Sequence, residues 1–347
     1  MNKDFRSDNV APPLPQILEA AVQGGGMWMD AYGDDQITGR LEERLAKIFE
    51  HEVAAFPILT GTAANALALA QMSGRFGQIL CHRLSHVYRD ECGAVEFHSQ
   101  GRLKALDGKN GKLDTETCAR GFGFLDDVHQ LRTTALSLSQ ATEVGTYYSA
   151  DEVLRLASWA KGHDAAVHMD GTRFANVVVA SGSTPAELTW RAGVDVLCLG
   201  ATKGGAIGTE VVVFFEHDLA DDFKRLMKRS GHLPSRLWFL AAQLEAYFDN
   251  DLWRESARHA NAMACRLGDA LSQNGIAPCY PAQTNMVFLK ADMGTYERLR
   301  KCGFKFYLID EENEGITARF VMSYATNTDD VERLAEAIIN ASYTNDR

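Results

Sequence analysis

The chain has 347 residues and a mass of 38.2 kDa, which is long enough for a large core and a second, smaller domain. Hydrophobic residues make up 46% and charged residues 23%, so disordered, collagen-like and coiled-coil proteins are excluded. The 35 basic and 46 acidic residues give a formal net charge of -11 without a local basic patch, and we expect no nucleic-acid partner.

The sequence carries no sign of export or membrane insertion. The amino-terminal stretch MNKDFRSDNVAPP lacks the apolar core of a secretory signal, and the apolar run 211–215 is too short to span a bilayer. The 7 cysteines are scattered without a C-x-x-C pair, which is typical of reduced packing residues rather than of disulfides or a zinc site. We therefore expect a cytoplasmic protein without a membrane partner.

Short apolar runs alternate with longer amphipathic segments between residues 38 and 216, the pattern of βα units on a mainly parallel sheet. Helical spacing is found at 38–50, 62–72 and 150–161, with a loop at 60–63 before the second of these helices. Buried strands are predicted at 54–59, 79–81, 135–138, 165–169 and 194–199. The pattern is almost wholly helical over 218–271, and 286–289, 304–308 and 318–322 then resemble strands flanked by helices.

These elements predict an α/β protein with one large domain and a smaller C-terminal α+β domain. We assign an N-terminal segment to residues 1–24, the large domain to 25–250 and the small domain to 251–347.

Two strands of the large domain end in residues that suit one cofactor. The strand 165–169 leads into Asp170, and one βα unit later the strand 194–199 leads into a turn with Lys203 among small residues. Because ligands in open α/β sheets bind outside the carboxyl ends of the strands, the acid and the lysine are expected to meet. Pyridoxal 5'-phosphate (PLP) needs a lysine for a Schiff base and a carboxylate that keeps its ring nitrogen protonated. The pair predicts a PLP site.

PLP also needs an anion site, which Gly61, Thr62 and Ala63 can supply through backbone N–H groups, a hydroxyl and a helix dipole. Each feature alone has a plainer interpretation: a capped helix start at 61–63, a surface lysine at 203 and a helix cap at 170. The combination in this chain order favours the cofactor.

His86 follows the strand that ends at Cys81 and belongs to the same crevice. His82, His86 and Glu91 could ligate a metal, as in a metal hydrolase, although their order is not H-E-x-x-H. The imidazole of His86 could instead stack on a flat cofactor ring, or be an ordinary hydrogen-bonded histidine. Spacing alone leaves all three interpretations open.

The order of these motifs along the chain carries a family resemblance. The matching stretches are 5–9 (FRSDN), 31–35 (AYGDD), 60–65 (TGTAAN), 86–93 (HVYRDECG), 127–129 (DVH), 168–173 (HMDGTR), 202–203 (TK) and 319–320 (RF). The chain resembles the low-specificity L-threonine aldolases, PLP enzymes of fold type I, and looks closest to the bacterial branch that includes phenylserine aldolases. The resemblance implies an aspartate-aminotransferase-like large domain with a mainly parallel sheet.

The resemblance also implies how the cofactor is held. Lys203 would hold PLP as an internal aldimine, Asp170 would pair with the pyridine nitrogen, and His86 would stack on the ring. Residues 61–63 would bind the phosphate of the cofactor. Thr202 stands where the family commonly has a serine before the lysine, and it keeps the hydroxyl.

Further matches concern the substrate. Ser7, Arg173 and Arg319 match positions that hold the substrate carboxylate, and Arg173 is also expected beside the cofactor. His129 matches the histidine that approaches the substrate hydroxyl, and Tyr32 matches a tyrosine contributed by a neighbouring subunit. Without the resemblance these are ordinary loop, turn or strand residues, and nothing else about His129 points to catalysis.

Two regions depart from the family pattern. The glycine-rich stretch expected after the long helix is replaced by 228–236, where Lys228, Arg229 or Arg236 is expected to reach a neighbouring subunit's phosphate. Among them Arg229 is included with the cofactor-binding residues. Asp90 stands where an aromatic or apolar residue often sits, which bears on the β-substituent that the substrate site prefers.

The implied reaction is reversible cleavage of L-threonine, L-allo-threonine and related β-hydroxy-α-amino acids such as phenylserine to glycine and an aldehyde. Lys203, Asp170, His86 and His129 are the expected catalytic residues, with one histidine as the base. Because a second chain would complete the site, a homodimer or homotetramer with the active site at the subunit interface is expected.

Three other functions stay open on the residues. Another fold type I PLP reaction, β-elimination or transamination, is possible because the lysine, acid and phosphate loop do not choose the bond that breaks. A metal hydrolase using His82, His86 and Glu91 is the second alternative, and a non-enzymatic binding protein that kept the fold is the third.

Overall fold

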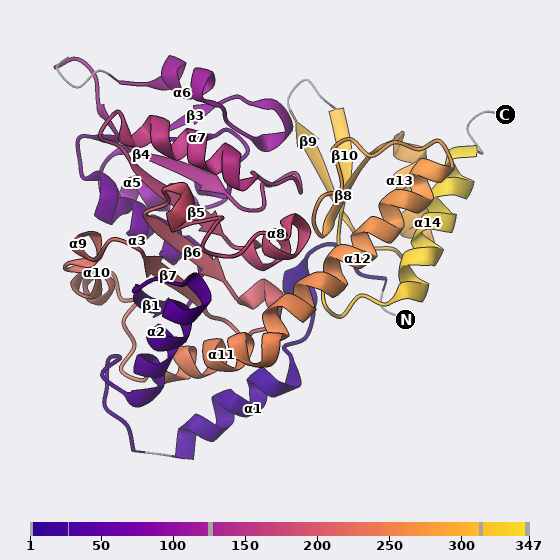
Figure 1. Cartoon of the computed structure of the whole chain (residues 1–347). Coiled ribbons are helices and arrows are strands. Elements are labelled where there is room, and N and C mark those ends of the chain that lie inside the picture. The colour runs from indigo at the N-terminus through magenta and orange to yellow at the C-terminus, as the bar shows by residue number, and fades with distance from the viewer. Residues whose placement is uncertain (1–2, 27, 124–127, 312–314, 344–347) are drawn as a thin grey trace.

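The computed structural model describes residues 3–26, 28–123, 128–311 and 315–343. Within them lie a seven-stranded sheet with the order β1-β7-β6-β5-β4-β2-β3 and a three-stranded antiparallel sheet with the order β8-β10-β9 (Figure 1). The strands are β1 Ala54–Ile58, β2 Gly77–His82, β3 Arg102–Leu106, β4 Arg132–Ser139, β5 Ala166–Gly171, β6 Val196–Gly200, β7 Glu210–Phe214, β8 Met286–Lys290, β9 Tyr307–Glu311 and β10 Gly315–Val321.

Helices precede, separate and follow these strands. They are α1 Pro15–Gln23, α2 Gln36–Phe49, α3 Gly61–Ser73, α4 His86–Arg89, α5 Ala94–Ser99, α6 Thr115–Gly121, α7 Ala150–Lys161, α8 Phe174–Ser181, α9 His217–Ala220, α10 Phe223–Arg229, α11 Trp238–Phe248, α12 Leu252–Gln273, α13 Met293–Lys301 and α14 Thr328–Tyr343. Among the described helices, none has the length and apolar content that crossing a bilayer requires.

The large sheet is mainly parallel, as predicted, and β7 is its exception. It pairs antiparallel with both β1 and β6. The connection 201–209 between β6 and β7 is too short for the crossover that a parallel pair needs, so the chain must turn back. This connection carries Lys203, and its shortness keeps the lysine at the carboxyl end of β6.

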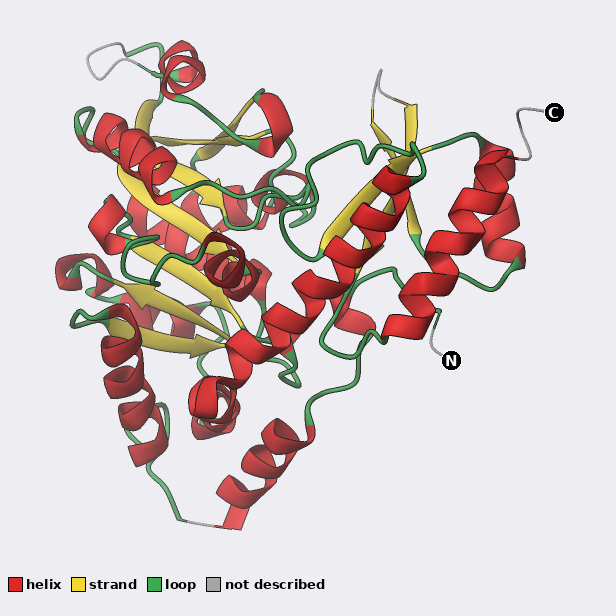
Figure 2. Ribbon diagram, turned by 45° about the vertical axis from the view of Figure 1, so that its right-hand side comes forward, coloured by secondary structure: helices red, strands yellow, loops and turns green. Residues whose placement is uncertain are grey.

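Helices lie on both sides of the seven-stranded sheet (Figure 2), and apolar clusters fill the space between them and each face of the sheet. Successive residues of one strand, such as Leu197 and Cys198 of β6, belong to different apolar clusters because their side chains point to opposite faces of the sheet. Helices α2, α7, α8 and α11 pack with one face, while α3, α5 and α10 pack with the other. The Ala-rich α3 is therefore buried against the sheet, and its start is fixed beside the carboxyl ends of the strands.

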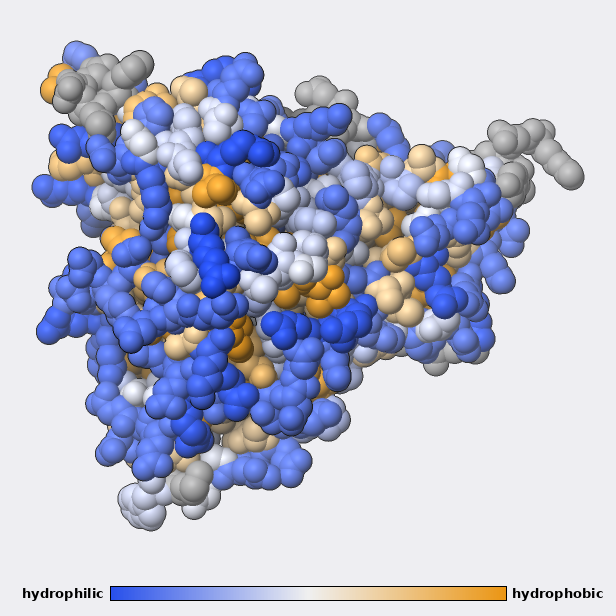
Figure 3. Space-filling model, viewed as in Figure 1, coloured by the Kyte–Doolittle hydropathy of each residue, from blue (hydrophilic) through white to orange (hydrophobic). Residues whose placement is uncertain are grey.

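The small sheet packs with α12, α13 and α14, and the N-terminal segment joins this core. Asp4 forms a parallel bridge with Lys305, and Phe5 is 1% exposed within the apolar cluster of the small domain. The next residues, Ser7 and Asp8, are thereby led from the small domain toward the large sheet. Charged and polar residues cover most of the face seen in Figure 3, as the composition predicts.

Most predicted elements are confirmed within one to three residues, and three regions differ from the prediction. The predicted loop 60–63 is already helix from Gly61, because Thr60 caps α3. The strand predicted at 304–308 lies at 307–311, and β3 was not predicted because its exposed Arg102 and Lys104 hide the apolar pattern. The domain boundary at residue 251 stays a prediction, although α12 begins at Leu252.

Candidate active site

A pocket of about 470 Å³ opens at the carboxyl edge of the large sheet. It is lined by the start of α3, by His86 of α4, by Thr172 after β5 and by the β6–β7 connection. The described lining residues are Asn9, Leu59, Thr60, Gly61, Thr62, Asn65, His86, Thr172, Thr202, Lys203, Gly208 and Glu210. The carboxyl ends of separate strands therefore meet at one crevice, as predicted.

Lys203 lies in this pocket on a single 3-10 turn, 202–204. Two glycines follow it, and the second must be a glycine. A Cβ on Gly205 would lie 2.5 Å from Leu14, and the φ of Gly205 is +121°. Burial and the positive charge of Arg173 lower the pKa of Lys203, against the attraction of Asp8 and other acids. A lowered pKa favours the neutral amine, which is the form that attacks a carbonyl.

Asp170 ends β5 and is 4% exposed. Its Oδ1 accepts from the backbone N–H of Thr172 at 3.1 Å and from the Thr172 hydroxyl at 2.6 Å, while Oδ2 accepts from Asn65 Nδ2 at 3.1 Å. Burial alone would raise the pKa of Asp170, but the charge of His86 and the bonds from Thr172 outweigh it and lower the pKa. The carboxylate is thus kept ionised in a buried place.

The start of α3 is arranged for an anion. The Thr60 hydroxyl accepts from the N–H of Ala63 at 3.2 Å, so that N–H is already used by the helix cap. The first-turn N–H groups of Gly61 and Thr62 have no partner within an α-helix, and Thr62 adds its hydroxyl. A Cβ on Gly61 would meet only the Thr172 hydroxyl, at 3.8 Å, so the space above it is open.

His86 begins α4, and a buried carboxylate holds its ring. Nδ1 lies 2.8 Å from Oε1 of Glu91, whose side chain is 0% exposed, whereas the His86 side chain is 33% exposed. The hydrogen bond to Glu91 raises the pKa of His86; burial opposes this, and the charges of Asp170 and Glu143 add to it. Glu91 therefore belongs to the site as the hydrogen-bond partner of His86.

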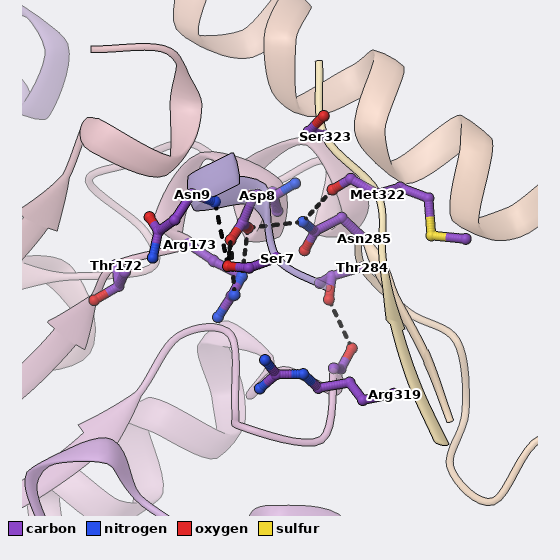
Figure 4. Close-up of polar contacts among 12 residues, drawn as sticks. Ser7, Asp8, Asn9, Thr172, Arg173, Thr284, Asn285, Arg319, Met322 and Ser323 are labelled. Atoms are coloured by element: carbon purple, nitrogen blue, oxygen red, sulfur yellow. Dashed lines mark hydrogen bonds and ion pairs between the residues drawn. The ribbon is translucent and has the colours of Figure 1, made fainter. Parts of the chain in front are cut away.

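The N-terminal turn supplies a second group of charges (Figure 4). Asp8 receives both Nε and Nη2 of Arg173, at 2.8 and 3.0 Å, in an ion pair whose side chains are 2% and 6% exposed. Asn285 Nδ2 also donates to Asp8, at 3.0 Å, and to the carbonyl of Met322 at 2.7 Å. Asp8 therefore joins the N-terminal segment, the large domain and the small domain at one point.

Arg319 of β10 lies beside this group, and Figure 4 shows its guanidinium pointing toward that of Arg173. Burial and the charge of Arg173 lower the pKa of Arg319, so the two guanidinium groups are close enough to interact electrostatically. Arg319 Nη2 donates to the carbonyl of Arg6 at 3.3 Å, and its buried Nε has no hydrogen-bond partner among the described residues. Ser7 caps the same turn by accepting from the N–H of Asn9 at 3.2 Å.

His129 is not brought to this group. It precedes β4, at the amino end of that strand, whereas Ser139 at the other end pairs with Asp170. Its neighbours include Phe76 and Arg132, which line a separate hollow of about 710 Å³. The motif lies before its strand rather than after it, so within one chain His129 is not part of the pocket, and Asp127 lies outside the described residues.

Other predicted residues lie outside the pocket of a single chain. Tyr32 is 40% exposed with a φ of +61°, and Lys228 Nζ lies 4.1 Å from its ring centre. Arg229 ends α10 in an exposed position, and Asp90 is exposed just after α4. Thr202, by contrast, lines the pocket and accepts from the N–H of Thr209 at 3.1 Å.

The metal alternative does not match the geometry. Both ring nitrogens of His82 are engaged, Nε2 with the carbonyl of Gly108 at 3.0 Å and Nδ1 with the N–H of Leu84 at 3.1 Å. No cluster of three or more potential metal ligands occurs in the described part of the chain. Glu91 is directed to His86 and Asn65 instead.

Several site residues were missed by the sequence analysis. Asp8 and Asn285 were hidden because their partners are remote in the chain, and Thr172 and Asn65 were seen only as parts of motifs. Glu143, in a turn after β4, acts electrostatically on Lys203 and His86. The sequence signal that could have identified Glu143 is its position as an acidic residue shortly after the buried strand β4.

The residues present fit PLP on four features of the structure. They are an amine of lowered pKa, a buried ionised carboxylate, an open helix start for a phosphate and an imidazole at the same pocket.

Comparison with known proteins agrees with this geometry. The β-eliminating lyase family matches residues 4–293. The low specificity L-threonine aldolase of Pseudomonas aeruginosa is 38% identical over 97% of this chain and 97% of its own, and that of another Pseudomonas is 36% identical with the same coverage. Among solved structures, a Leishmania major threonine aldolase has a TM-score of 0.91 at 23% identity, covering 97% of this chain and 98% of its own. A Sphingomonas wittichii serine palmitoyltransferase has a TM-score of 0.74 at 15% identity, covering 98% and 87%.

Proposed function

The chain belongs to the β-eliminating lyase family and groups there with the low-specificity L-threonine aldolases, and from this we propose which of its own residues perform the cleavage. It is a PLP-dependent lyase of fold type I that splits threonine into glycine and an aldehyde. The observation that carries the assignment of residues is that Lys203 and His86 line one pocket, with Asp170 hydrogen-bonded to Asn65 and Thr172 of the same lining.

PLP, when bound, supplies an electron sink for the pair left behind when the Cα–Cβ bond breaks. We assign Lys203 as the residue that binds it covalently, and Asp170 Oδ2 as the acceptor for its ring N–H. Asp170 is suited to this because Oδ1 is already held by Thr172, while among the described residues Oδ2 accepts one bond, from Asn65. Gly61, with Thr62, binds the phosphate at the start of α3.

We assign the substrate carboxylate to the two arginines beside the N-terminal turn. Asp8 takes two nitrogens of Arg173 and so fixes the plane of that guanidinium, while Arg319 carries a buried Nε without a partner among the described residues. A carboxylate accepts charge-assisted bonds from such a pair, and Ser7 lies on the same turn. This arrangement orients an amino acid with its amine toward Lys203.

We assign His86 as the base, and His129 has no part in the proposal. His86 Nδ1 is engaged by Glu91, so Nε2 is the nitrogen left to take a proton from the β-hydroxyl. As the hydroxyl loses its proton, the Cα–Cβ bond breaks and the aldehyde leaves. Return of a proton to Cα completes glycine.

We infer that the enzyme works as a homodimer or homotetramer in the cytoplasm. A hollow of about 1120 Å³, lined by Trp28, Trp238 and Phe239 among others, shares Leu59 with the active-site pocket. Trp28 is fully exposed there, and a second copy covering it would bring residues such as Tyr32 or Arg229 to a neighbouring site. Seven free cysteines fit a reducing compartment. The mass of the holoenzyme in sedimentation tests the assembly.

The function is tested by mixing the holoenzyme separately with L-threonine and L-phenylserine. We expect equal amounts of aldehyde and glycine from each, without ammonia or keto acid, because the β-hydroxyl is the group that His86 addresses. Keto acid with ammonia would instead indicate β-elimination. The ratio of the two rates measures which β-substituent the enzyme prefers. We expect Asp90, exposed at the end of the short helix that His86 begins, to influence this preference.

A further inference from the structure

His86 and Asp170 are joined by a continuous chain of buried hydrogen bonds. Glu91 Oε1 lies 2.8 Å from His86 Nδ1 and 2.8 Å from Asn65 Nδ2, and the same Asn65 nitrogen lies 3.1 Å from Asp170 Oδ2. Asn65, Glu91 and Asp170 are 1%, 3% and 4% exposed. The residue expected on one side of the cofactor ring is therefore linked to the acid expected at its nitrogen.

The chemistry of the bridge fixes its orientation. Asn65 lies between two carboxyl groups, which accept, so its NH₂ group must face both of them and its carbonyl cannot. Oε1 of Glu91 takes both donors, while its buried Oε2 has no partner among the described residues. The imidazole of His86 is thus the group that can balance the charge of Glu91, and it does so through Nδ1.

We propose that Glu91, held in place by Asn65, is the positioning residue that fixes the His86 ring through Nδ1 and stabilises its protonated form. The inference rests on the proposed role of His86. In the cleavage direction the β-hydroxyl O–H bond breaks and an Nε2–H bond forms, while Glu91 stays ionised and compensates the new positive charge. A carboxylate behind a histidine base increases its basicity and selects its tautomer.

The charges around His86 determine the direction of the expected change. Glu91 follows α4, Asp170 ends β5 and Glu143 lies in the turn after β4; all three favour the imidazolium, and burial opposes it. Removing the charge of Glu91 leaves two acids against burial, so the pKa of His86 must fall. An opposite charge at this distance shifts a pKa by about one to three units.

The test is Glu91→Gln, which preserves size and an acceptor oxygen. With ¹³C-labelled histidine, the His86 NMR signal, identified by its loss in His86→Asn, is expected to titrate at least about one pH unit lower than in the wild-type holoenzyme. The acidic limb of kcat/KM for threonine should move down by the same amount, because only unprotonated His86 accepts the proton. Its plateau should fall roughly tenfold, since a weaker base transfers the proton less well.

Three further variants separate this role from a merely structural one. Glu91→Asp keeps the charge and should keep a high pKa for His86, and Asn65→Ala should lower it less than Glu91→Gln because Asn65 supports the ionised form of Glu91. Glu96→Gln, on neighbouring α5, should leave the titration unchanged. If Glu91→Gln does not fold, Asn65→Ala tests the same prediction, since it should also lower the pKa of His86.

An unchanged His86 titration in Glu91→Gln, or in Asn65→Ala where that variant replaces it, would overturn the proposal even if the aldolase activity is intact. The proposed function fails differently, by absence of glycine and aldehyde from the wild-type holoenzyme. A shifted NMR titration without a shifted kcat/KM limb would show that His86 is not the base, which overturns the inference while the aldolase activity itself stands.

Discussion

Two parts of the candidate site are assembled from the chain in different ways. The cofactor floor, meaning Lys203, Asp170, His86 and residues 60–62, comes from βα units of one sheet whose strand ends meet at one edge. The arginine wall, meaning Asp8, Arg173, Asn285 and Arg319, draws on the N-terminal segment, the large domain and the small domain. The floor is fixed by the path of neighbouring strands, whereas the wall exists only when three remote parts of the chain dock.

This difference predicts different failures. A change in the floor should remove chemistry and leave the fold, because each residue is held by its own strand or helix. A change that breaks the Asp8–Arg173 ion pair of the wall should cost stability and substrate binding together, because this pair also connects the domains.

The largest effect is expected in the floor, from Lys203→Ala. Loss of the amine removes the covalent attachment of the cofactor, so threonine cleavage should fall below detection while urea unfolding stays close to that of the wild type. Aldehyde release and the absorbance of the cofactor bound to lysine measure the first, and urea titration the second. Retained turnover would refute the role of Lys203 in the floor.

The next effect is expected in the wall, from Asp8→Asn. Arg173 would be left buried without its counter-ion, and breaking a buried pair from one side costs about 3 to 5 kcal/mol in the free energy of unfolding. KM for threonine should rise as well. Glu116→Gln breaks an exposed pair with Arg120 and should change stability by less than about 0.5 kcal/mol. Equal stability in the two variants would contradict the comparison.

A smaller change is expected from Arg319→Lys. The ammonium keeps the charge but loses the planar fork, so KM for threonine should rise roughly tenfold with little change in kcat. Stability should change little, because the Asp8–Arg173 pair remains. Steady-state kinetics measure both constants, and a fall in kcat at constant KM would show that Arg319 does not bind the substrate carboxylate.

The effect of acid on the wall is confined to low pH. Burial would raise the pKa of Asp8, but Arg173, Lys203 and its hydrogen bonds outweigh this and lower the pKa below its usual 3.8. The stability that Asp8 contributes is therefore present above about pH 4 and is lost as pH falls through the lower, folded-state value. The difference in unfolding free energy between wild type and Asp8→Asn should shrink between neutral pH and about pH 3, and a constant difference would contradict the ion pair.

The sequence predicted the floor well because its signals are local. An acid or lysine directly after a buried strand must lie at the carboxyl edge of the sheet, so Asp170 and Lys203 could be paired before their distance was known. His86 was found in the same way, and only the structure, through the bond to Glu91 and the engaged ring of His82, counted against its interpretation as a metal ligand. The role of His129 stays a prediction, because a matched motif does not tell on which side of its strand it lies and the single chain places His129 at the amino end of β4.

By itself, the sequence determined the fold class through its periodicity and the cofactor through the residues at its strand ends, because both are properties of short segments. The family came from the resemblance that the order of its motifs carries. Only the tertiary structure decided that Asp8 faces Arg173, that Asn285 supports the pair, and that Asn65 and Glu91 connect His86 with Asp170. Those contacts join residues far apart in sequence, and each is selected because a buried charge needs a partner that local sequence cannot specify.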